Sequence, residues 1–466
     1  MNDKEKINIE HLVEAFDAYI ECGTSKMWEE KELFLLMDYF ATERQYERSL
    51  EICEEGINNF PYSLSFYLKK VIYLLELNKV DEVASILEQV NALSPGNHIV
   101  TLLHARLLFK LGNHRDALKL LSFIEGKMDN NNTCELLILK ANILEEEGQT
   151  DEIFHILTRA VLLDPKNEEA IEYFWSWIES YKKYEEGISI FSNLLDLDSY
   201  NGLSWYYLGL SHSYLGNYDE ALEALEYAYL STPGLEIAYR EFGNLCFELK
   251  KFQKALEAYE EMMSLFVSDS EILMMCGQCC LELNQTQKSL AYFRKALQSD
   301  PMNDEVLYNI GEVFLQHKDW KKAILYYKRA INIEDQREEY YASMGIAYQQ
   351  LEDIDKAEFC FQEAVNLAPC EPKYWLYYLS FLIHANRKQE AIELAKAGEL
   401  ETEGSTMIFA HVACLLAAGQ RKEALMMLGV ALEEDYSTHT VLFTLLPDVE
   451  ADPEVTEMLQ YYRPEQ

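Results

Sequence analysis

Apolar and small residues recur with helical spacing in two halves of the segment 202–235, and a polar break separates the halves. These positions are Trp205, Leu208, Gly209, Ala221, Leu225 and Ala228. Their spacing matches the 3.6-residue turn of an α-helix and not the two-residue alternation of a strand. The break holds Gly216 and Asn217, a typical turn signal, and Pro233 closes the segment. The segment therefore predicts two amphipathic helices joined by a tight turn.

The same pattern repeats along most of the chain. Five glycines stand 34 residues apart, at Gly209, Gly243, Gly277, Gly311 and Gly345. Alignment on them divides 30–438 into twelve units, which begin at 30, 64, 98, 134, 168, 202, 236, 270, 304, 338, 372 and 405. The twentieth position is Ala, Ser or Gly in ten of the twelve units, as close helix packing requires. A fixed period of this length predicts a solenoid, in which each helical pair buries its apolar face against its neighbours.

Shorter helices are expected on both sides of the repeats. Apolar residues fit one amphipathic helix over 8–22, and another short helix fits 441–446. Asp452 followed by Pro453 predicts a helix start, because Asp caps a helix and Pro is tolerated in its first turn. We therefore predict an N-terminal capping helix within 1–29, the repeat array in 30–438 and C-terminal capping helices in 439–466. Terminal repeats need such a cover for their apolar faces.

The order of residues in the unit 202–235 resembles the tetratricopeptide repeat. The residues that carry the resemblance are Trp205, Leu208, Gly209, Tyr218, Ala221, Leu225, Ala228 and Pro233. The resemblance implies an all-α fold, a right-handed superhelix of helix-turn-helix repeats. It is strongest over 202–371 and weaker where the eighth position is neither Gly nor Ala, as at Met37, Val71, Trp175, Leu379 and Val412. We expect Trp175 to push its helices apart and make the superhelix irregular over 168–201.

The net charge of the chain disfavours two classes of binding partner. The chain has 40 Lys and Arg against 80 Asp and Glu, a net charge of −40. Nucleic acids and anionic membranes bind clustered Lys and Arg, so both are disfavoured. Residues 1–26 lack a basic segment followed by an apolar one, and no stretch approaches the roughly 18 apolar residues of a membrane span. We expect no nucleic-acid binding, no membrane insertion and a cytoplasmic location.

Local catalytic motifs are absent from the sequence. It contains no G-x-x-x-x-G-K, G-x-G, G-x-S-x-G or H-E-x-x-H. An enzyme could use the carboxylates Glu145, Glu169 and Glu172, but no nucleophile or metal-ligand spacing accompanies them. We therefore predict a protein that is not an enzyme and that uses no cofactor.

Cys276, Cys279 and Cys280 form a C-x-x-C with a further cysteine beside it. Such a cluster could bind a metal or act in redox chemistry. Cys276 and Cys280 occupy the seventh and eleventh positions of their unit, as Cys246 does the eleventh, and these positions pack inside the array. Zinc prefers four ligands, and no second C-x-x-C is present. We interpret these cysteines as core residues with free thiols and predict no metal site.

The resemblance also implies a concave wall made by the first helix of each unit, with positions 2, 5, 6, 9, 12 and 13 facing the groove. At these positions thirteen of the fourteen charges in the units from 134 to 338 are acidic. Exposed aromatic residues are typical of peptide-binding grooves. Two plain alternatives remain: the tyrosines pack against neighbouring helices, or the acidic wall is simply solvated. The candidate partner-binding residues are Tyr173, Tyr206, Tyr207, Tyr214, Tyr308, Glu172, Arg240, Glu241, Asn244 and Asn309.

Some members of this family hold a C-terminal carboxylate with a set of Lys, Arg and Asn. Arg240 and Asn244 match its first part, but Met275 stands where Asn is needed and Glu305 replaces a cation. We therefore expect no such clamp. Our hypothesis is a non-enzymatic scaffold or adaptor that binds a basic or amphipathic protein segment. The alternative is a non-catalytic regulatory subunit of an enzyme or signalling complex.

Overall fold

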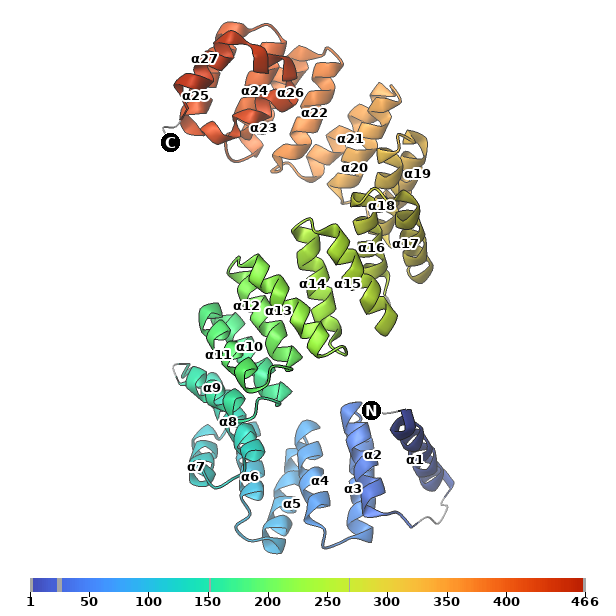
Figure 1. Ribbon diagram of the computed structural model, residues 1–466, viewed down its shortest axis with the longest axis vertical. Coiled ribbons are helices and arrows are strands. Elements are labelled where there is room, and N and C mark those ends of the chain that lie inside the picture. The colour runs from blue at the N-terminus through green and yellow to red at the C-terminus, as the bar shows by residue number, and fades with distance from the viewer. Residues whose placement is uncertain (1–2, 23–26, 151, 268, 464–466) are drawn as a thin grey trace. The chain divides into compact units, whose positions relative to one another are not determined.

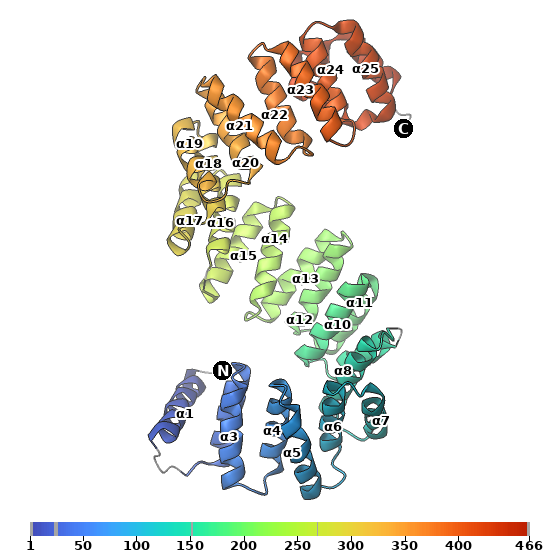
Figure 2. The ribbon, with the colours of Figure 1, turned by 180° about the vertical axis from the view of Figure 1, so that it is seen from behind.

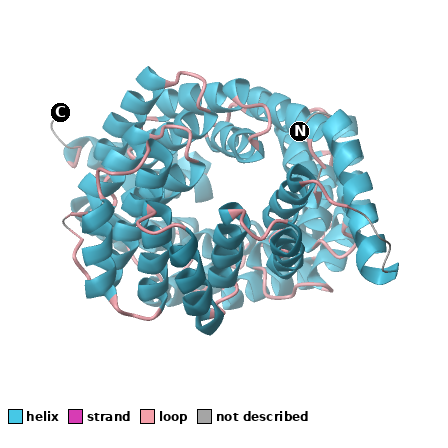
Figure 3. Ribbon diagram, turned by 90° about the horizontal axis from the view of Figure 1, so that it is seen from below, coloured by secondary structure: helices cyan, strands magenta, loops and turns pink. Residues whose placement is uncertain are grey.

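The computed structural model describes residues 3–22, 27–150, 152–267 and 269–463. Within these ranges every regular element is a helix, as Figure 3 shows. The chain divides into two compact units, an N-terminal unit of residues 1–238 and a C-terminal unit of residues 239–466. The division falls inside α14 (Glu236–Glu248). The predicted all-α fold class is confirmed.

The helices follow one another in short steps along each unit (Figure 1). The N-terminal unit holds α1 (Asp3–Cys22), α2 (Glu30–Thr42), α3 (Tyr46–Asn59), α4 (Leu64–Glu76), α5 (Val80–Leu93), α6 (His98–Lys110), α7 (His114–Ile124), α8 (Asn130–Glu146), α9 (Ile153–Leu163), α10 (Glu168–Tyr181), α11 (Tyr184–Leu197), α12 (Gly202–Tyr214) and α13 (Tyr218–Ser231).

The C-terminal unit continues from α14 in the same manner (Figure 2). It holds α15 (Phe252–Leu265), α16 (Ser270–Glu282), α17 (Thr286–Ser299), α18 (Asp304–Gln316), α19 (Trp320–Ile331), α20 (Glu338–Gln350), α21 (Ile354–Leu367), α22 (Pro372–His384), α23 (Lys388–Glu401), α24 (Thr406–Ala417), α25 (Arg421–Glu434), the 3₁₀ helix η1 (Tyr436–His439), α26 (Thr440–Leu445), the 3₁₀ helix η2 (Pro447–Ala451) and α27 (Pro453–Tyr461).

In the described part of the chain, α2 to α25 form twelve successive pairs, each with a first, A helix and a second, B helix. Ten of the A helices begin at the predicted first residue of their unit. The exceptions are α24, which begins one residue late, and α8, which begins at Asn130 instead of 134. The early start of α8 has a local cause, because the Asp129 side chain caps it by accepting a hydrogen bond from the Asn132 amide.

Each pair packs between its neighbours. Within each unit a B helix contacts the A helix of the following pair, as α11 does α12 and α19 does α20. The A helices also contact one another, in the series α4, α6, α8, α10 and α12 and again in the series α16, α18, α20, α22 and α24. In each unit the A helices therefore form a continuous layer, which is the layer that carries the candidate residues.

The regular glycines stand where the two helices of a pair approach each other most closely. A Cβ atom added at Gly243, Gly277 or Gly311 would lie 2.4 Å from an aromatic ring on the B helix. These rings belong to the residue sixteen positions later, for example Tyr327 opposite Gly311. Any side chain at the eighth position would clash with such a ring. The close approach explains the 34-residue period of glycine.

The turn inside every pair contains one residue in the left-handed backbone region. It is always the fifteenth position of the unit, and φ there is positive at residues 44, 78, 112, 148, 182, 216, 250, 284, 318, 352, 386 and 419. Glycine and asparagine, which adopt this conformation at low cost, occupy seven of these positions. The turn geometry thus persists even where Lys182 or Glu352 must adopt it.

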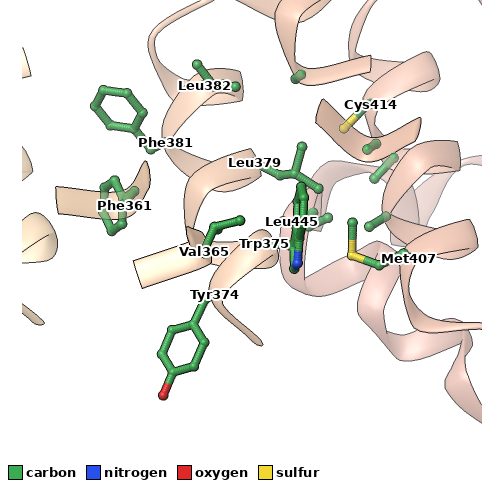
Figure 4. Close-up of a cluster of buried hydrophobic side chains, with 14 of the residues drawn as sticks. Phe361, Val365, Tyr374, Trp375, Leu379, Phe381, Leu382, Met407, Cys414 and Leu445 are labelled. Carbon is green, nitrogen blue, oxygen red and sulfur yellow. The ribbon is translucent and has the colours of Figure 1, made fainter. Parts of the chain in front are cut away.

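The C-terminal helices agree with the predicted ones. The helix α26 lies within one residue of the predicted 441–446, and Asp452 caps α27 by accepting hydrogen bonds from the amides of Glu454 and Val455. In the core of the last pairs, Trp375 lies beside Met407 and Leu445 of α26 (Figure 4). These helices thus bury apolar surface of the final repeats.

Candidate functional site

Trp175 occupies the eighth position of its pair, where glycine precedes a large B-helix residue in five later pairs. The B-helix residue opposite Trp175 is Phe191, so both residues are large. The Trp175 ring does not stack on Phe191, since the centroids are 6.4 Å apart and the planes are tilted by 46°. It stacks instead on Tyr207 of the next A helix, at 5.0 Å and 17°. The expected conflict is thus relieved by turning the indole toward α12.

This turn of Trp175 builds a group of aromatic rings on α10, α11 and α12. Tyr214 lies 6.2 Å from Trp175, and Tyr184 stacks on Tyr214 at 4.7 Å with an interplanar angle of 6°. We call Trp175, Tyr184, Tyr207 and Tyr214 the aromatic cluster. Trp175 and Tyr207 are each 7% exposed, whereas Tyr214 is 55% exposed. The cluster therefore has a buried base and an accessible edge.

Two carboxylates lie next to the cluster. Glu172 and Glu179 are seven residues apart on α10, which places them on one face of the helix, and both are exposed. Glu179 accepts a hydrogen bond from the Tyr214 hydroxyl at 3.2 Å. Burial raises the pKa of Tyr207 to about 12, and the negative charges of Glu172 and Glu179 add to this increase. Neither carboxylate pairs with a Lys, Arg or His among the residues the structure describes.

A cleft of about 350 Å³ adjoins these residues near the N-terminal ends of α10 and α12. Glu172 lines it together with the apolar side chains of Leu203, Leu235 and Ile237, and Lys166 stands at its edge as the one cation of the lining. Ile237 is 43% exposed. Glu172 therefore borders both the aromatic cluster and a partly apolar hollow, a combination that suits an amphipathic ligand.

Two further predicted residues of the N-terminal unit contact their neighbours. Tyr173 is half-buried and donates a hydrogen bond to Glu145 of α8 at 2.7 Å. Burial and this bond raise the pKa of Tyr173. Tyr206 is half-buried, with its ring 5.1 Å from that of Tyr207. Tyr173 thus helps to join the successive A helices α8 and α10, while Tyr206 contacts its neighbour on α12.

The predicted polar residues of the C-terminal unit have partners within the chain. Arg240 bonds to Asp269 and Glu271, each at 3.0 Å. Asn244 accepts a hydrogen bond from the Tyr259 hydroxyl at 2.7 Å. Burial raises the pKa of Glu241, the charge of Glu248 adds to the effect, and Arg240 opposes it. A ligand would have to compete with these contacts.

Tyr308 and Asn309 brace neighbouring A helices. Tyr308 stacks on Tyr340 at 4.8 Å, and its hydroxyl lies 3.3 Å from that of Ser343. Asn309 is 9% exposed, donates to the Glu305 carbonyl at 2.8 Å and accepts from Gln278 at 3.2 Å. Asn309 and Tyr207 are therefore buried, which corrects the expectation that their side chains are exposed in the groove. The neighbouring pair closes over both of them.

Sequence reasoning missed a set of tyrosine–carboxylate bonds between successive pairs. Tyr340 donates to Asp304 at 2.7 Å, and Tyr374 donates to Glu338 at 3.5 Å. In both cases a Tyr at the third position of one unit meets an acid at the first position of the preceding unit, 36 residues earlier. That spacing is a signal readable from the sequence. Part of the tyrosine and acid content thus serves packing between helices, which was one of the two plain alternatives.

Tyr184 and Glu179 were also absent from the predicted site. The signal for them is Trp175 itself, because a large residue at the eighth position must direct its ring out of its own pair. Tyr184 begins α11, and Glu179 follows Glu172 by two helical turns. Their proximity to Tyr214 depends on how α10, α11 and α12 pack together.

The cysteines of α16 are buried. Cys276, Cys279 and Cys280 are 0% exposed, and burial raises the pKa of all three thiols, that of Cys279 to about 12. Such thiols stay protonated and unreactive. Nine cysteines of the described residues are free. In the same ranges no group of three or more His, Cys, Asp or Glu side chains is placed to hold a metal ion.

No helix in the described ranges combines the length and apolarity that are required to cross a bilayer.

Comparison with known families matches three parts of the repeat array. The family described as tetratricopeptide repeat matches residues 202–235, 281–338 and 338–369. This chain therefore contains tetratricopeptide repeats. A TPR repeat-containing protein of Methanocaldococcus jannaschii is 22% identical over 241 residues, covering 47% of this chain and 41% of that relative. The chain thus matches about two fifths of the length of the relative.

Several solved structures are similar to this chain at low sequence identity. Yeast Tom70 is 15% identical, with 92% of this chain and 99% of that chain covered and a TM-score of 0.43. Cut9, in its complex with Hcn1 from the APC/C, is 12% identical, with 94% and 97% covered and a TM-score of 0.38. YrrB, a TPR protein with an unusual peptide-binding site, is 15% identical, with 42% and 97% covered and a TM-score of 0.34. A tetratricopeptide repeat array of this kind supports a protein-interaction scaffold, and such proteins are generally non-catalytic.

Proposed function

We propose that this tetratricopeptide repeat protein is a non-enzymatic scaffold or adaptor, which binds a basic or amphipathic segment of another protein on its layer of A helices. One observation carries the proposal. On α10 and α12 the accessible edge of Tyr214 lies beside Glu179, and Glu172, two turns nearer the start of α10, lines a partly apolar cleft. Neither carboxylate has a cationic partner in the described chain. This surface offers charge, ring faces and apolar contact together.

The charges favour a basic ligand. With a net charge of −40, the chain attracts cationic segments over long range, and salt weakens this attraction. Individual exposed ion pairs contribute only about 0.2–1 kcal/mol, so steering alone does not give tight binding. Aromatic side chains and the apolar cleft supply the contact area from which most affinity comes.

The N-terminal and C-terminal units contribute unequally to the proposed binding surface. In the C-terminal unit Arg240, Asn244 and Asn309 already bond to other side chains, and Tyr308 packs against Tyr340. Binding there would have to break internal contacts. We therefore assign the main binding surface to α10 and α12 and a secondary role to the residues of the C-terminal unit.

A selection from a library of random linear peptides displayed on phage tests the proposal with the full chain as bait. We expect enrichment of basic or amphipathic peptides, whose affinity falls as salt increases. The variant Glu172→Gln with Glu179→Gln should bind them less tightly, roughly tenfold or more. The variant Glu223→Gln with Glu226→Gln is the matched control, because it removes the same charge from exposed positions of the B helix α13.

Failure of the selection would contradict the proposed function. Enrichment of acidic or neutral polar peptides, or of none, would remove the case for a basic segment. Equal loss of binding in both double variants would show that total charge, and not the surface on α10 and α12, governs recognition.

A further inference from the structure

We infer that this chain associates with a second copy of itself through two rows of opposite charge on its B helices. An acidic row in the N-terminal unit of one copy binds a lysine row in the C-terminal unit of the other. This contact uses the B-helix side and not the A-helix layer of the proposed function, so the two are tested independently.

The two rows occupy the nineteenth position of successive repeat units. This residue is the third of its B helix, or in α9 the residue directly before the helix. It is acidic in five consecutive units and lysine in the next four. The sign changes between residues 220 and 254, an interval that contains the division of the two compact units. The acidic row consists of Glu82, Asp116, Glu152, Glu186 and Glu220, and the lysine row consists of Lys254, Lys288, Lys322 and Lys356.

The lysine row is the half that helix stability does not explain. The N-terminus of a helix carries a partial positive charge, so an acid in the first turn is favourable and a cation is unfavourable. Lys322 and Lys356 each pair with the Asp three residues earlier, at 2.7 and 2.5 Å. Lys254 and Lys288 have no carboxylate partner among the residues that the structure describes, and both are exposed. These two lysines are therefore available to a carboxylate from outside the chain.

The lysine row belongs to a wider basic surface on α17 and α19. Both helices contact α18, and they lie next to each other in Figures 1 and 2. They contain no Asp or Glu, although acids outnumber bases two to one in the whole chain. Their seven cations are all exposed: Lys288, Arg294, Lys295, Lys321, Lys322, Lys328 and Arg329. In the described part of the chain only Lys322 of these has a carboxylate partner, so this surface fits an acidic one.

The acidic row offers a surface of matching spacing. Its residues recur every 34 positions with one step of 36, so the packing of helical pairs spaces its charges as it spaces those of the lysine row. Glu82 and Glu220 are exposed and form no salt bridge with another described residue. Asp116 and Glu186 are 50% and 40% exposed, and each pairs with one lysine of its own helical pair. Such exposed pairs contribute little, so they can exchange for contacts with a second copy.

Apolar side chains accompany both rows. Leu325 lies among the cations of α19 and is 56% exposed, and Tyr218 lies two residues before Glu220 and is 46% exposed. Apolar and aromatic groups of this kind supply contact area that exposed ion pairs alone do not give.

The net charge of −40 selects the pairing of the rows. Two whole chains repel each other over long range, but at 0.15 M ionic strength the Debye length is about 8 Å, so charges in contact outweigh distant ones. Acid against acid and lysine against lysine are both repulsive, which leaves the acidic row of one copy against the lysine row of another. Such a head-to-tail contact produces a ring or an open chain of copies.

Sedimentation velocity of the full chain at about 0.15 M salt tests the inference over roughly 1 to 100 μM protein. We expect the sedimentation coefficient to rise with concentration. Lys254→Glu with Lys288→Glu reverses the two unpaired lysines, and Glu186→Lys with Glu220→Lys reverses two neighbouring acids of the other row. Each double variant should weaken self-association about tenfold. An equimolar mixture of the two should associate again, because each variant supplies the row that the other has lost.

The two double variants change the net charge in opposite directions. If total charge governed association, the less negative variant, Glu186→Lys with Glu220→Lys, would associate more tightly than the unmodified chain. Lys396→Glu with Lys422→Glu is the matched control, because it reverses two exposed cations on α23 and α25 outside the rows, and it should change the affinity less than twofold. Thermal unfolding of every variant shows whether the fold is retained.

Three results would overturn the inference. They are an unmodified chain that stays monomeric up to about 100 μM, a mixture of the two variants that does not associate, and a loss in the control as large as in the row variants. None of them affects the peptide selection, which probes the A-helix layer. Enrichment of basic peptides would then leave the scaffold function in place without self-association.

Discussion

At the scale of single residues, two tyrosines of one helix have opposite surroundings. Tyr207 and Tyr214 both lie on α12, and the repeat pattern predicted that both face the groove. Tyr207 is 7% exposed under the stacked ring of Trp175, while Tyr214 is 55% exposed and stacks on Tyr184. The first therefore contributes mainly to stability, and the second keeps an accessible surface.

This difference predicts that truncating the two side chains will lower the stability of the fold by unequal amounts. Tyr207→Ala should lower the free energy of unfolding by about 3 kcal/mol, since it leaves a cavity beneath Trp175. Tyr214→Ala should cost about 1 kcal/mol or less, the value of a stacking contact at an exposed site. Urea unfolding followed by circular dichroism measures both. Equal destabilisation by the two variants would contradict the assignment of Tyr207 to the core.

Glu241 gives a pH-dependent prediction. Burial and Glu248 raise its pKa in the fold, so its contribution to stability is complete below the unfolded pKa, near 4.3, and is lost as pH rises through the folded pKa. Glu241→Gln, which mimics the neutral form, should raise Tm at pH 7 by roughly 1–2 °C. The gain should vanish near pH 4. Thermal unfolding at both pH values checks this, with the exposed Glu226→Gln as control.

At the scale of helical pairs, the residues at the eighth and twenty-fourth positions vary inversely in size. Glycine faces Tyr259, Phe293 or Tyr327, where the B-helix residue is an aromatic ring. At the other extreme, Leu379 faces Ala395 in a later pair. The space between the two helices limits the summed volume of these two side chains. Trp175 opposite Phe191 breaks this relation, and its ring is displaced onto the next pair.

Adding a side chain at one of the glycine positions should lower the stability of the fold. Gly311→Ala would place a methyl group 2.4 Å from the Tyr327 ring, and we expect a loss of about 1–3 kcal/mol in the free energy of unfolding. Gly234→Ala is the matched control, because no neighbouring atom lies within 4 Å of its added Cβ and its φ is not positive. Chemical denaturation of both variants is the measurement. A loss in the control as large as in Gly311→Ala would show that helix packing is not the cause.

At the scale of the whole molecule, the net charge of −40 destabilises the folded chain but favours the binding of basic peptides. Self-repulsion destabilises a compact chain, and salt screens it. Raising ionic strength from about 0.01 M to about 1 M, which shortens the Debye length from about 30 Å to about 3 Å, should therefore increase Tm. The same change should weaken binding of the selected basic peptides. Calorimetry measures the Tm and the peptide affinity at each ionic strength. A rise of both with salt, or a fall of both, would contradict this account.

The sequence by itself determined the helical pairs and their positions. The glycine at the eighth position, the turn at the fifteenth and the closing residues lie within 34 residues of one another, so each unit is specified by local signals. For this reason ten A helices begin at the predicted residue, and Asp452 caps α27 as expected. The α8 start was misplaced because the glycine alignment took no account of the Asp129 cap.

Only the tertiary structure decided which candidate residues remain accessible. Tyr207 and Asn309 are buried, Arg240 is bonded to Asp269 and Glu271, and Tyr214 stays exposed. The repeat register assigns all four to the A-helix layer but does not say what covers them. That depends on side chains from the adjacent pair, and at α10 it depends on the direction in which one oversized indole could turn. Apart from the 36-residue spacing of the tyrosine–carboxylate bonds, the contacts between repeats have no signal within a single repeat, so the accessible surface emerged only when the pairs were packed together.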